Sequence, residues 1–392
     1  MELIVYIILL LPPSRTHPVM AAPGLLGDLQ DLELLPGRDR QRGMRARNPP
    51  VINRRLDPLR ALSDTEFKSH FRFDKESVTR LAGILNLGRQ NNRGRPLTPV
   101  QQVCLALNFY AGGHFTRIAG MCGGVSQKTA WLAIQRVTNQ LCLLKAQYIR
   151  MPTTREMEET ANRLEAKFHL PRFAFGIDGV VMCFDGAPRK IPEGTVQQDF
   201  WHRKMLYAIN VQVVGNDQHL IHDINVDWQG STNDARVWKN SPVKRVIERQ
   251  RRFLLAGDSG YAISENLITP YRNAEALANP RRRKFNQRLS GLRTVCTENI
   301  FGIIKRRFPE LTKLRCSHSR ARKIIVAIAI LHNISILWND DEPVGGIQPE
   351  EDLAGPAVPE QEYEILEDDA EPAVVRARGQ ELREQLCLNM PP

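Results

Sequence analysis

The chain has 392 residues, of which 42% are hydrophobic and 25% charged, a composition that is ordinary for a soluble globular protein with room for two domains. Its net charge of +11 is unevenly divided, because the residues from Asp340 onward carry −12 and those before them carry +23. A body this basic favours a polyanionic partner such as nucleic acid, although a basic protein without such a partner would have the same composition.

The seven cysteines are scattered and form neither a CxxC pair nor a close cysteine–histidine set. This pattern indicates reduced thiols and argues against a zinc site. The apolar start of the chain lacks a basic segment and is shorter than the roughly 18–20 residues of a membrane span. We therefore expect no membrane association, and we expect the protein in the nucleus and cytoplasm.

Residues 1–55 are predicted to be a disordered basic arm. From residue 13 onward this segment is rich in proline, glycine and arginine and has few apolar anchors. The arm either clamps phosphates or acts as a solvated linker.

Residues 56–150 have a helical pattern. Ser63 and Glu66 form a capping-box sequence, and the segments 115–124 and 125–141 have the spacing of a helix-turn-helix in which Ser126 caps the second helix. The residues expected to reach base edges are Gln127, Lys128 and Thr129, and those expected to face the core are Trp131, Ile134 and Val137. A plain helical bundle is the alternative.

The apolar pattern of residues 151–338 predicts a mixed α/β sheet with flanking helices. Apolar runs at 172–184, 205–214 and 220–227 indicate three consecutive strands, followed by a helix at 233–250 and a fourth strand at 252–257. Asp178 then lies in the first strand, and Asp258 follows the fourth. The carboxyl end of a parallel strand is where open α/β sheets place their ligands.

A third acid, Glu298, lies in a predicted helix beside a buried stripe of Ile300, Ile304 and Phe308. Carboxylates that converge from two strands and a helix supply the hard oxygen ligands that Mg²⁺ or Mn²⁺ requires. Asp178, Asp258 and Glu298 are therefore the predicted catalytic and metal-binding residues. Spacing alone does not establish the site, since the chain has 43 acidic residues and solvated or ion-paired acids are the alternative.

Several motifs occur in order along the chain: GIDG at 176–179, an Arg-Lys pair at 203–204 followed by Asn210 and Gln212, WQGSTNDARVWKNS at 228–241, GDSGY at 257–261, Glu298 shortly before a Phe-Gly pair, and LHNIS at 331–335. Over roughly residues 60–338 the chain thereby resembles the Harbinger transposase-derived DDE nuclease family. The resemblance implies a ribonuclease-H-like fold, a metal-dependent Asp178/Asp258/Glu298 site, and a separate Myb-like DNA-binding partner. The chain departs from the family pattern at Val181, where histidine is usual, and at His202, where asparagine is usual.

Two features near the motifs leave alternatives open. Asp234 is either an accessory ligand or the cap of the following helix, and we favour the cap. Between Arg272 and Lys323 there are 15 lysines and arginines against three acids, which predicts a wall that holds the phosphate backbone. Its RRRK sequence at 281–284 is also typical of a nuclear import signal, and short basic runs are often solvated loops.

Residues 339–392 are acidic and punctuated by proline, and are predicted to be a disordered tail in which only the segment near 378–390 forms a short helix. The tail either screens the basic face, binds a partner or has no specific role.

Three functions are compatible with these features, and the third is a protein-interaction module that acts through the acidic tail. The first is a divalent-metal-dependent DNA endonuclease that uses two metal ions to hydrolyse phosphodiester bonds. The second is a domesticated DNA-binding or partner-binding scaffold with little or no nuclease activity. The presence of all three acids favours the first, and Val181 keeps the second open.

Overall fold

The computed structural model describes residues 57–88, 96–112, 125–188, 190–340, 365 and 367–391. All of these residues belong to one compact unit, residues 52–392. The predicted basic arm at 1–55 lies outside the described residues.

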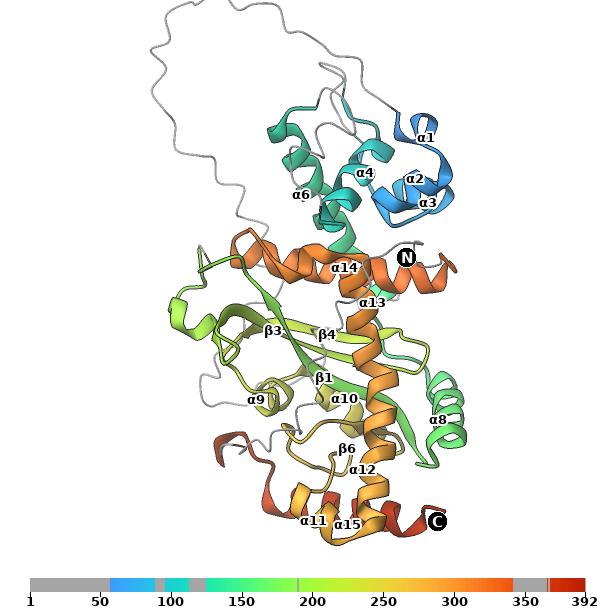
Figure 1. Cartoon of the computed structure of the whole chain (residues 1–392), viewed down its shortest axis with the longest axis vertical. Helices are drawn as coiled ribbons and strands as arrows, with labels where there is room; N and C mark the ends of the chain where they lie inside the picture. The colour runs from blue at the N-terminus through green and yellow to red at the C-terminus, as the bar shows by residue number, and fades with distance from the viewer. Residues whose placement is uncertain are drawn as a thin grey trace, which may run out of the picture. The chain divides into compact units, whose positions relative to one another are not determined.

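Several helices precede the sheet, and most of them have side-chain caps (Figure 1). Their bounds are Pro58–Ala61 for α1, Asp64–Phe71 for α2, Lys75–Ile84 for α3, Pro99–Tyr110 for α4, Gln127–Leu143 for α6 and Lys145–Tyr148 for α7. The capping box predicted at Ser63 and Glu66 is present at the start of α2, where the Ser63 hydroxyl accepts from the Glu66 amide and the Glu66 carboxylate accepts from the Ser63 amide. These helices share one apolar cluster with the sheet strands and with α13 (Asn299–Arg307) and α14 (His318–Leu337).

Helix α6 begins as predicted, with the Ser126 hydroxyl accepting from the Thr129 amide 3.2 Å away. Ile134 and Val137 are buried, whereas Trp131 is partly exposed and stacks under the Arg320 guanidinium at 4.6 Å. The preceding segment, 113–124, lies outside the described residues. The helix-turn-helix therefore stays a prediction.

The centre of the region 151–338 is a six-stranded mixed sheet with the order β2-β3-β1-β5-β6, in which β4 also pairs with β3. The strands are Phe173–Cys183 (β1), Trp201–His202 (β2), Leu206–Gly215 (β3), Ile221–Gln229 (β4), Leu254–Ala256 (β5) and Leu267–Ile268 (β6). Strands β1, β3 and β4 form an antiparallel meander, and β5 joins β1 in parallel. This arrangement confirms the predicted ribonuclease-H-like α/β class.

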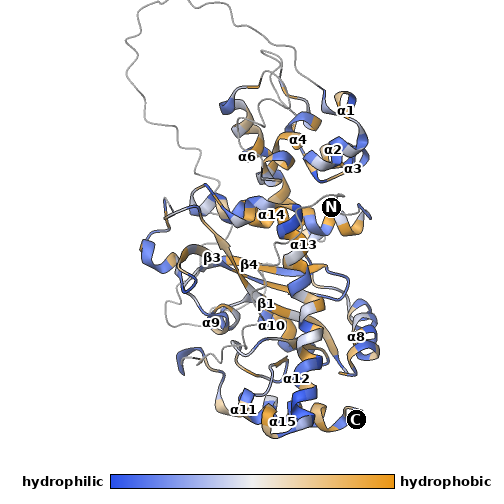
Figure 2. Ribbon diagram, in the orientation of Figure 1, coloured by the Kyte–Doolittle hydropathy of each residue, from blue (hydrophilic) through white to orange (hydrophobic). Residues whose placement is uncertain are grey.

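Helices cover both faces of this sheet. Alternation along β5 points Leu255 to one apolar cluster and Leu254 and Ala256 to another. The first cluster includes residues of α8 (Thr154–Phe168), α9 (Asp234–Lys239) and α10 (Pro242–Gln250). The second includes residues of α11 (Asn273–Ala278), α12 (Pro280–Arg293) and α15 (Ala373–Asn389). Figure 2 shows the central strands in hydrophobic colours and α12 as largely hydrophilic along its outer surface.

Helix α14 is 20 residues long, and the polar residues of its LHNIS motif have a structural role. The Asn333 side chain donates to the Ile221 and Tyr148 carbonyls and accepts from the Ile221 amide. His332 Nε2 lies 2.8 Å from the His219 carbonyl. The motif thereby holds the turn between β3 and β4. Among the described residues, no helix is both long and apolar enough to cross a membrane.

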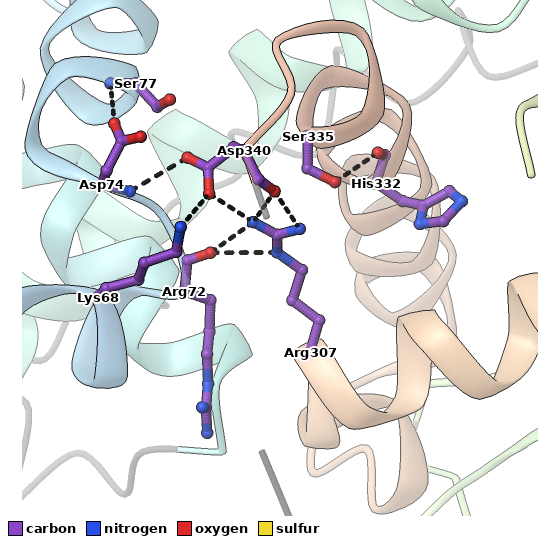
Figure 3. A network of polar contacts seen from close by, with 8 residues as sticks. All are labelled: Lys68, Arg72, Asp74, Ser77, Arg307, His332, Ser335 and Asp340. Carbon is purple, nitrogen blue, oxygen red and sulfur yellow. Dashed lines mark hydrogen bonds and ion pairs between the residues drawn. The ribbon is translucent and has the colours of Figure 1, made fainter. Parts of the chain in front are cut away.

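A buried ion-pair network connects α2 and α3 to α13 and α14 (Figure 3). The Asp340 carboxylate, whose side chain is fully buried, accepts from Arg307 at 3.0 Å, from Lys68 at 3.2 Å and from the Asp74 amide at 3.1 Å. Arg307 also donates to the Arg72 carbonyl. Asp340 therefore belongs to the folded core, although the acidic tail was predicted to begin at residue 339.

The described part of the acidic tail is also folded. A 3-10 turn at Glu367–Asp369 precedes α15, whose Leu386 and Cys387, with the following Met390, enter the cluster under α12. The acidic, proline-rich composition predicted disorder, because composition alone does not show that Leu386, Cys387 and Met390 make these apolar contacts. Helix formation near 378–390 was expected, but its length and its packing were not.

Candidate active site

Asp178 lies in the middle of β1, opposite Val213 of β3. Because successive side chains of a strand point to opposite faces, Asp178 points away from the face that contains the buried Ile177. It faces the helical segments that follow α12. Its Oδ2 accepts from Arg293 Nη1 at 3.1 Å, and its Oδ1 accepts from the Gly179 amide at 2.9 Å.

Asp258 follows β5 by two residues, at the carboxyl end of a parallel strand as the sequence predicted. Its Oδ1 accepts from the Gly260 amide at 3.0 Å, which fixes the tight turn of the GDSGY segment. The neighbouring Tyr261 is fully buried behind this turn.

Glu298 ends a short π-helical segment, Thr294–Glu298, between α12 and α13. Its carboxylate accepts from Arg293 Nη2 at 2.9 Å and from the Thr294 hydroxyl at 2.8 Å. The side chain is 41% exposed, and the predicted stripe of Ile300, Ile304 and Phe308 is buried below it. Such π-helical turns are frequent at functional sites.

The three predicted acids share one electrostatic environment. Burial raises the pKa of Asp178 well above its ordinary value, against the opposing effect of Arg293, and Asp258, Asp234 and Glu298 each raise it further. Burial also raises the pKa of Asp258, while Arg293 and the Gly260 amide oppose the shift. The structure therefore brings Asp178, Asp258 and Glu298 into mutual electrostatic contact around Arg293.

The donor chemistry of this site fits a divalent cation. Carboxylate oxygens are the ligands that Mg²⁺ and Mn²⁺ prefer, and a cation would relieve the repulsion that raises these pKa values. Within the described residues, however, no group of three or more His, Cys, Asp or Glu side chains is close enough together to hold a metal ion. Arg293 is the positive charge that bridges Asp178 and Glu298 here.

Asp234 does not cap its helix, contrary to the interpretation we favoured from sequence. The cap is Asn233, whose side chain accepts from the Arg236 amide at 2.8 Å. Asp234 instead accepts from Asn210 Nδ2 at 2.9 Å and lies against Gly179, where an added Cβ would collide with its carboxylate. Burial and the charge of Asp258 raise the pKa of Asp234 to about 6.

Sequence reasoning missed the role of Arg293. It precedes Glu298 by five residues, a spacing that an ordinary α-helix does not place on one face. The π-helical turn at Thr294–Glu298 widens the helix locally. The signal available in the sequence was therefore a basic residue five positions before Glu298. Its role can be inferred only once the π-helical turn between the two residues is known.

The two departures from the family pattern lie beside the site. Val181 pairs with Asn210 across β1 and β3. His202 accepts from the Lys204 amide through Nδ1 at 3.2 Å, and burial together with Arg203 and Lys204 lowers the pKa of His202 to about 4. His202 is therefore neutral at physiological pH.

The basic segment between Arg272 and Lys323 does not form a single phosphate-facing wall, contrary to the prediction. Arg281 and Arg288 donate to the carbonyls of Met390 and Pro391, and Arg282 pairs with Glu384 of α15 at 3.2 Å. Arg307 is buried in the network of Figure 3. By contrast, the exposed Arg203 is close enough to lower the pKa of both Asp234 and Asp258.

Residues 177–333 match the family described as DDE superfamily endonuclease. The ribonuclease-H-like sheet agrees with this match, and the region is therefore similar to DDE superfamily endonuclease domains.

Individual relatives agree with that class. The chain is 28% identical over 319 residues to the Homo sapiens protein named "Putative nuclease HARBI1". The alignment covers 78% of this chain and 86% of that protein. It is 24% identical over 275 residues to "Protein ALP1-like" of Arabidopsis thaliana, in an alignment that covers 65% of this chain and 66% of that protein. No solved structure matches the chain. The predicted resemblance to the Harbinger-derived nucleases is confirmed.

Proposed function

We propose that this protein is a divalent-metal-dependent DNA endonuclease that hydrolyses phosphodiester bonds with Asp178, Asp258 and Glu298. The observation that carries the proposal is the convergence of these acids, from β1, from the turn after β5 and from the π-helical turn, on one buried electrostatic field. Ion-paired surface acids would not be brought together in this way.

Each acid has a distinct part. Asp178 and Asp258 are largely buried and supply fixed oxygens at the sheet edge, whereas Glu298 is more exposed and approaches from the helix side. Bound there, Mg²⁺ or Mn²⁺ would activate water and stabilise the leaving oxygen of the phosphodiester. Arg293 holds Asp178 and Glu298 together and has to release at least one of them before both can bind a cation.

DNA is the proposed substrate because the body of the chain is strongly basic and the exposed Arg203 is close enough to Asp234 and Asp258 to lower their pKa values. Cations at a cleft neutralise phosphates and release their counterions. A Myb-like protein is the proposed partner for target recognition, and the nucleus and cytoplasm are the proposed locations.

A scaffold without nuclease activity is the second candidate, and Arg293 is the observation that favours it. A guanidinium that already neutralises Asp178 and Glu298 gives the fold a stable site without metal. In that case the domain would bind DNA or a partner and leave the phosphodiester intact.

Cleavage of supercoiled and linear DNA in Mg²⁺ or Mn²⁺ tests the proposal. We expect cutting by the wild type that is lost in Asp258→Asn and in the presence of a chelator. Wild-type protein that binds DNA in a salt-sensitive manner but does not cut it, with or without a Myb-like partner, would support the scaffold instead.

A further inference from the structure

The hairpin formed by β2 and β3 presents an apolar side chain to solvent at its tip. His202 pairs with Leu206, so the loop consists of the three residues between them, Arg203, Lys204 and Met205. All three are exposed. Met205 is 74% exposed, which makes it the most exposed of the large hydrophobic residues in the described part of the chain. Burial in the core therefore does not explain this methionine.

The backbone of Met205 is also unfavourable for a methionine. Its φ of 60° lies in the left-handed region, and its amide donates to the His202 carbonyl at 2.9 Å. Three-residue hairpin loops place a residue in this region, where glycine is usual because it has no Cβ. The other described non-glycine residues with positive φ are all polar or charged. Strained residues of this kind cluster at active sites and ligand clamps.

The hairpin holds this loop in a defined position. The Trp201 and Tyr207 rings contact each other edge to face, with their centroids 4.9 Å apart. Within the loop, the Lys204 amide donates to His202 Nδ1 at 3.2 Å. Met205 is thus presented on a rigid support, and its apolar side chain is available to a ligand at little further cost in conformational entropy.

The loop lies beside the predicted catalytic acids. Burial raises the pKa of Asp258, and Arg203 is among the groups that oppose this shift, so its positive charge is close to that carboxylate. Burial lowers the pKa of Lys305 on α13, and the nearby charge of Lys204 lowers it further. The loop therefore combines an exposed apolar tip with cations at one edge of the site.

DNA has the chemistry that this combination fits. Proteins that bend DNA insert apolar side chains, methionine among them, between neighbouring base steps. Arginine and lysine side chains beside such a wedge bind the phosphates and fix its position along the duplex. The base faces would then cover the apolar surface that the fold leaves exposed.

We propose that Met205 inserts between two neighbouring base pairs of the bound DNA, while Arg203 and Lys204 bind the phosphates next to this step. The insertion bends the duplex beside the catalytic acids and so selects the phosphodiester that reaches them. Pyrimidine–purine steps are preferred, because they unstack most easily. This proposal rests on the proposed function, since it takes DNA as the substrate.

Fluorescence of the base analogue 2-aminopurine tests the insertion without relying on cleavage, because this base brightens when it is unstacked. A duplex with 2-aminopurine at several positions is saturated with protein in Ca²⁺ instead of Mg²⁺, so that the DNA stays intact. We expect the wild type to raise the fluorescence. Met205→Gly should lose this increase but weaken binding by less than about tenfold, because Arg203 and Lys204 still hold the phosphates.

Two further variants and a stability measurement separate the wedge from the fold. Met205→Leu retains an apolar side chain and should keep the fluorescence increase. Leu277→Ala should keep it as well, because Leu277 is 69% exposed but lies on α11, outside the hairpin. Glycine relieves the positive φ, so Met205→Gly should unfold at a higher urea concentration than the wild type. Loss of the fold would then not explain the lost fluorescence.

Wild-type protein that binds the duplex without raising the fluorescence, or Met205→Gly that raises it fully, overturns the insertion and leaves the proposed nuclease function intact. Self-association of the wild type that Met205→Gly abolishes would assign this methionine to an interface between two copies, and would also overturn the insertion. Wild-type protein that does not bind DNA even at low salt overturns both proposals.

Discussion

At the scale of single residues, Arg293 determines the charge balance of the candidate active site. Its guanidinium donates to Asp178 and to Glu298 and is only 11% exposed, so it neutralises two acids that would otherwise repel each other. Removing one partner of a buried ion pair is more damaging than removing both, because an uncompensated charge stays behind. In this protein a bound cation could take over that compensation.

Arg293→Gln should therefore destabilise the metal-free protein by about 3 kcal/mol, and Mn²⁺ should restore part of the loss. Urea unfolding in chelator and in Mn²⁺ would measure both values. Arg315→Gln is the control, because Arg315 forms a largely exposed ion pair with Asp185 and should cost less than about 1 kcal/mol. Equal destabilisation by Arg293→Gln in chelator and in Mn²⁺ would show that cation and guanidinium do not compete.

Asp234 was misjudged from the sequence because its role depends on a neighbour one position away. Asn233 and Asp234 are both good helix caps, and only the backbone shows that Asn233 takes the role and frees Asp234. Asp178 and Asp258 were placed correctly because each adjoins a strand whose apolar run is unmistakable.

At the scale of elements, the strongly patterned strands and helices were predictable and the short ones were not. The predicted strands at 172–184, 205–214 and 220–227 agree with β1, β3 and β4 within two residues. The predicted helix at 233–250 is divided into α9 and α10 because Pro242 starts a new helix. Strands β2 and β6 have two residues each, too few to produce a hydrophobic period.

Helix α14 makes the stability of the fold sensitive to acid. Burial lowers the pKa of His332 to about 4, so the folded state keeps this histidine neutral while the unfolded state protonates it near its ordinary value of 6.5. The unfolded state therefore binds more protons between these values, and stability is lost as the pH falls from 6.5 to 4.

Over this range His332 should cost the wild type up to about 3 kcal/mol of unfolding free energy. His332→Gln, which retains a donor for the His219 carbonyl, should lose less stability on acidification than the wild type. Unfolding curves at several pH values would give the difference, with the exposed His169→Asn as control. A slope in His332→Gln as steep as in the wild type would assign the acid sensitivity to other groups.

At the scale of the whole molecule, the acidic tail occupies part of the basic surface. Asp369 pairs with Arg236 at 3.0 Å, and Glu371 pairs with Lys244, next to the GSTND motif. Farther along, Glu384 accepts from Arg282 and from the Tyr271 hydroxyl. Of the three roles considered for the tail, these contacts support screening of basic residues.

Freeing Arg236 and Lys244 should strengthen DNA binding. The double variant Asp369→Asn/Glu371→Gln should bind DNA about tenfold more tightly at low salt, and its affinity should fall more steeply with salt, by up to about two counterions. Fluorescence anisotropy in about 50–200 mM salt would measure the affinity for DNA and its salt dependence. The matched control is Glu381→Gln, because Glu381 is an exposed acid of the following helix α15 and accepts from Gln385. A salt dependence unchanged from the wild type would mean that these two cations do not contact DNA.

The packing of α15 also has a consequence for how the protein is made. Gly379 lies directly against the Ser264 backbone, and Leu386 and Met390 complete a cluster whose other members begin at Leu164. The larger cluster on α14 includes no described residue beyond Trp338 and can assemble first. During synthesis, the part of this cluster that α15 completes therefore stays exposed until the end of α15 has left the ribosome, although α11 and α12 can already pack on the sheet.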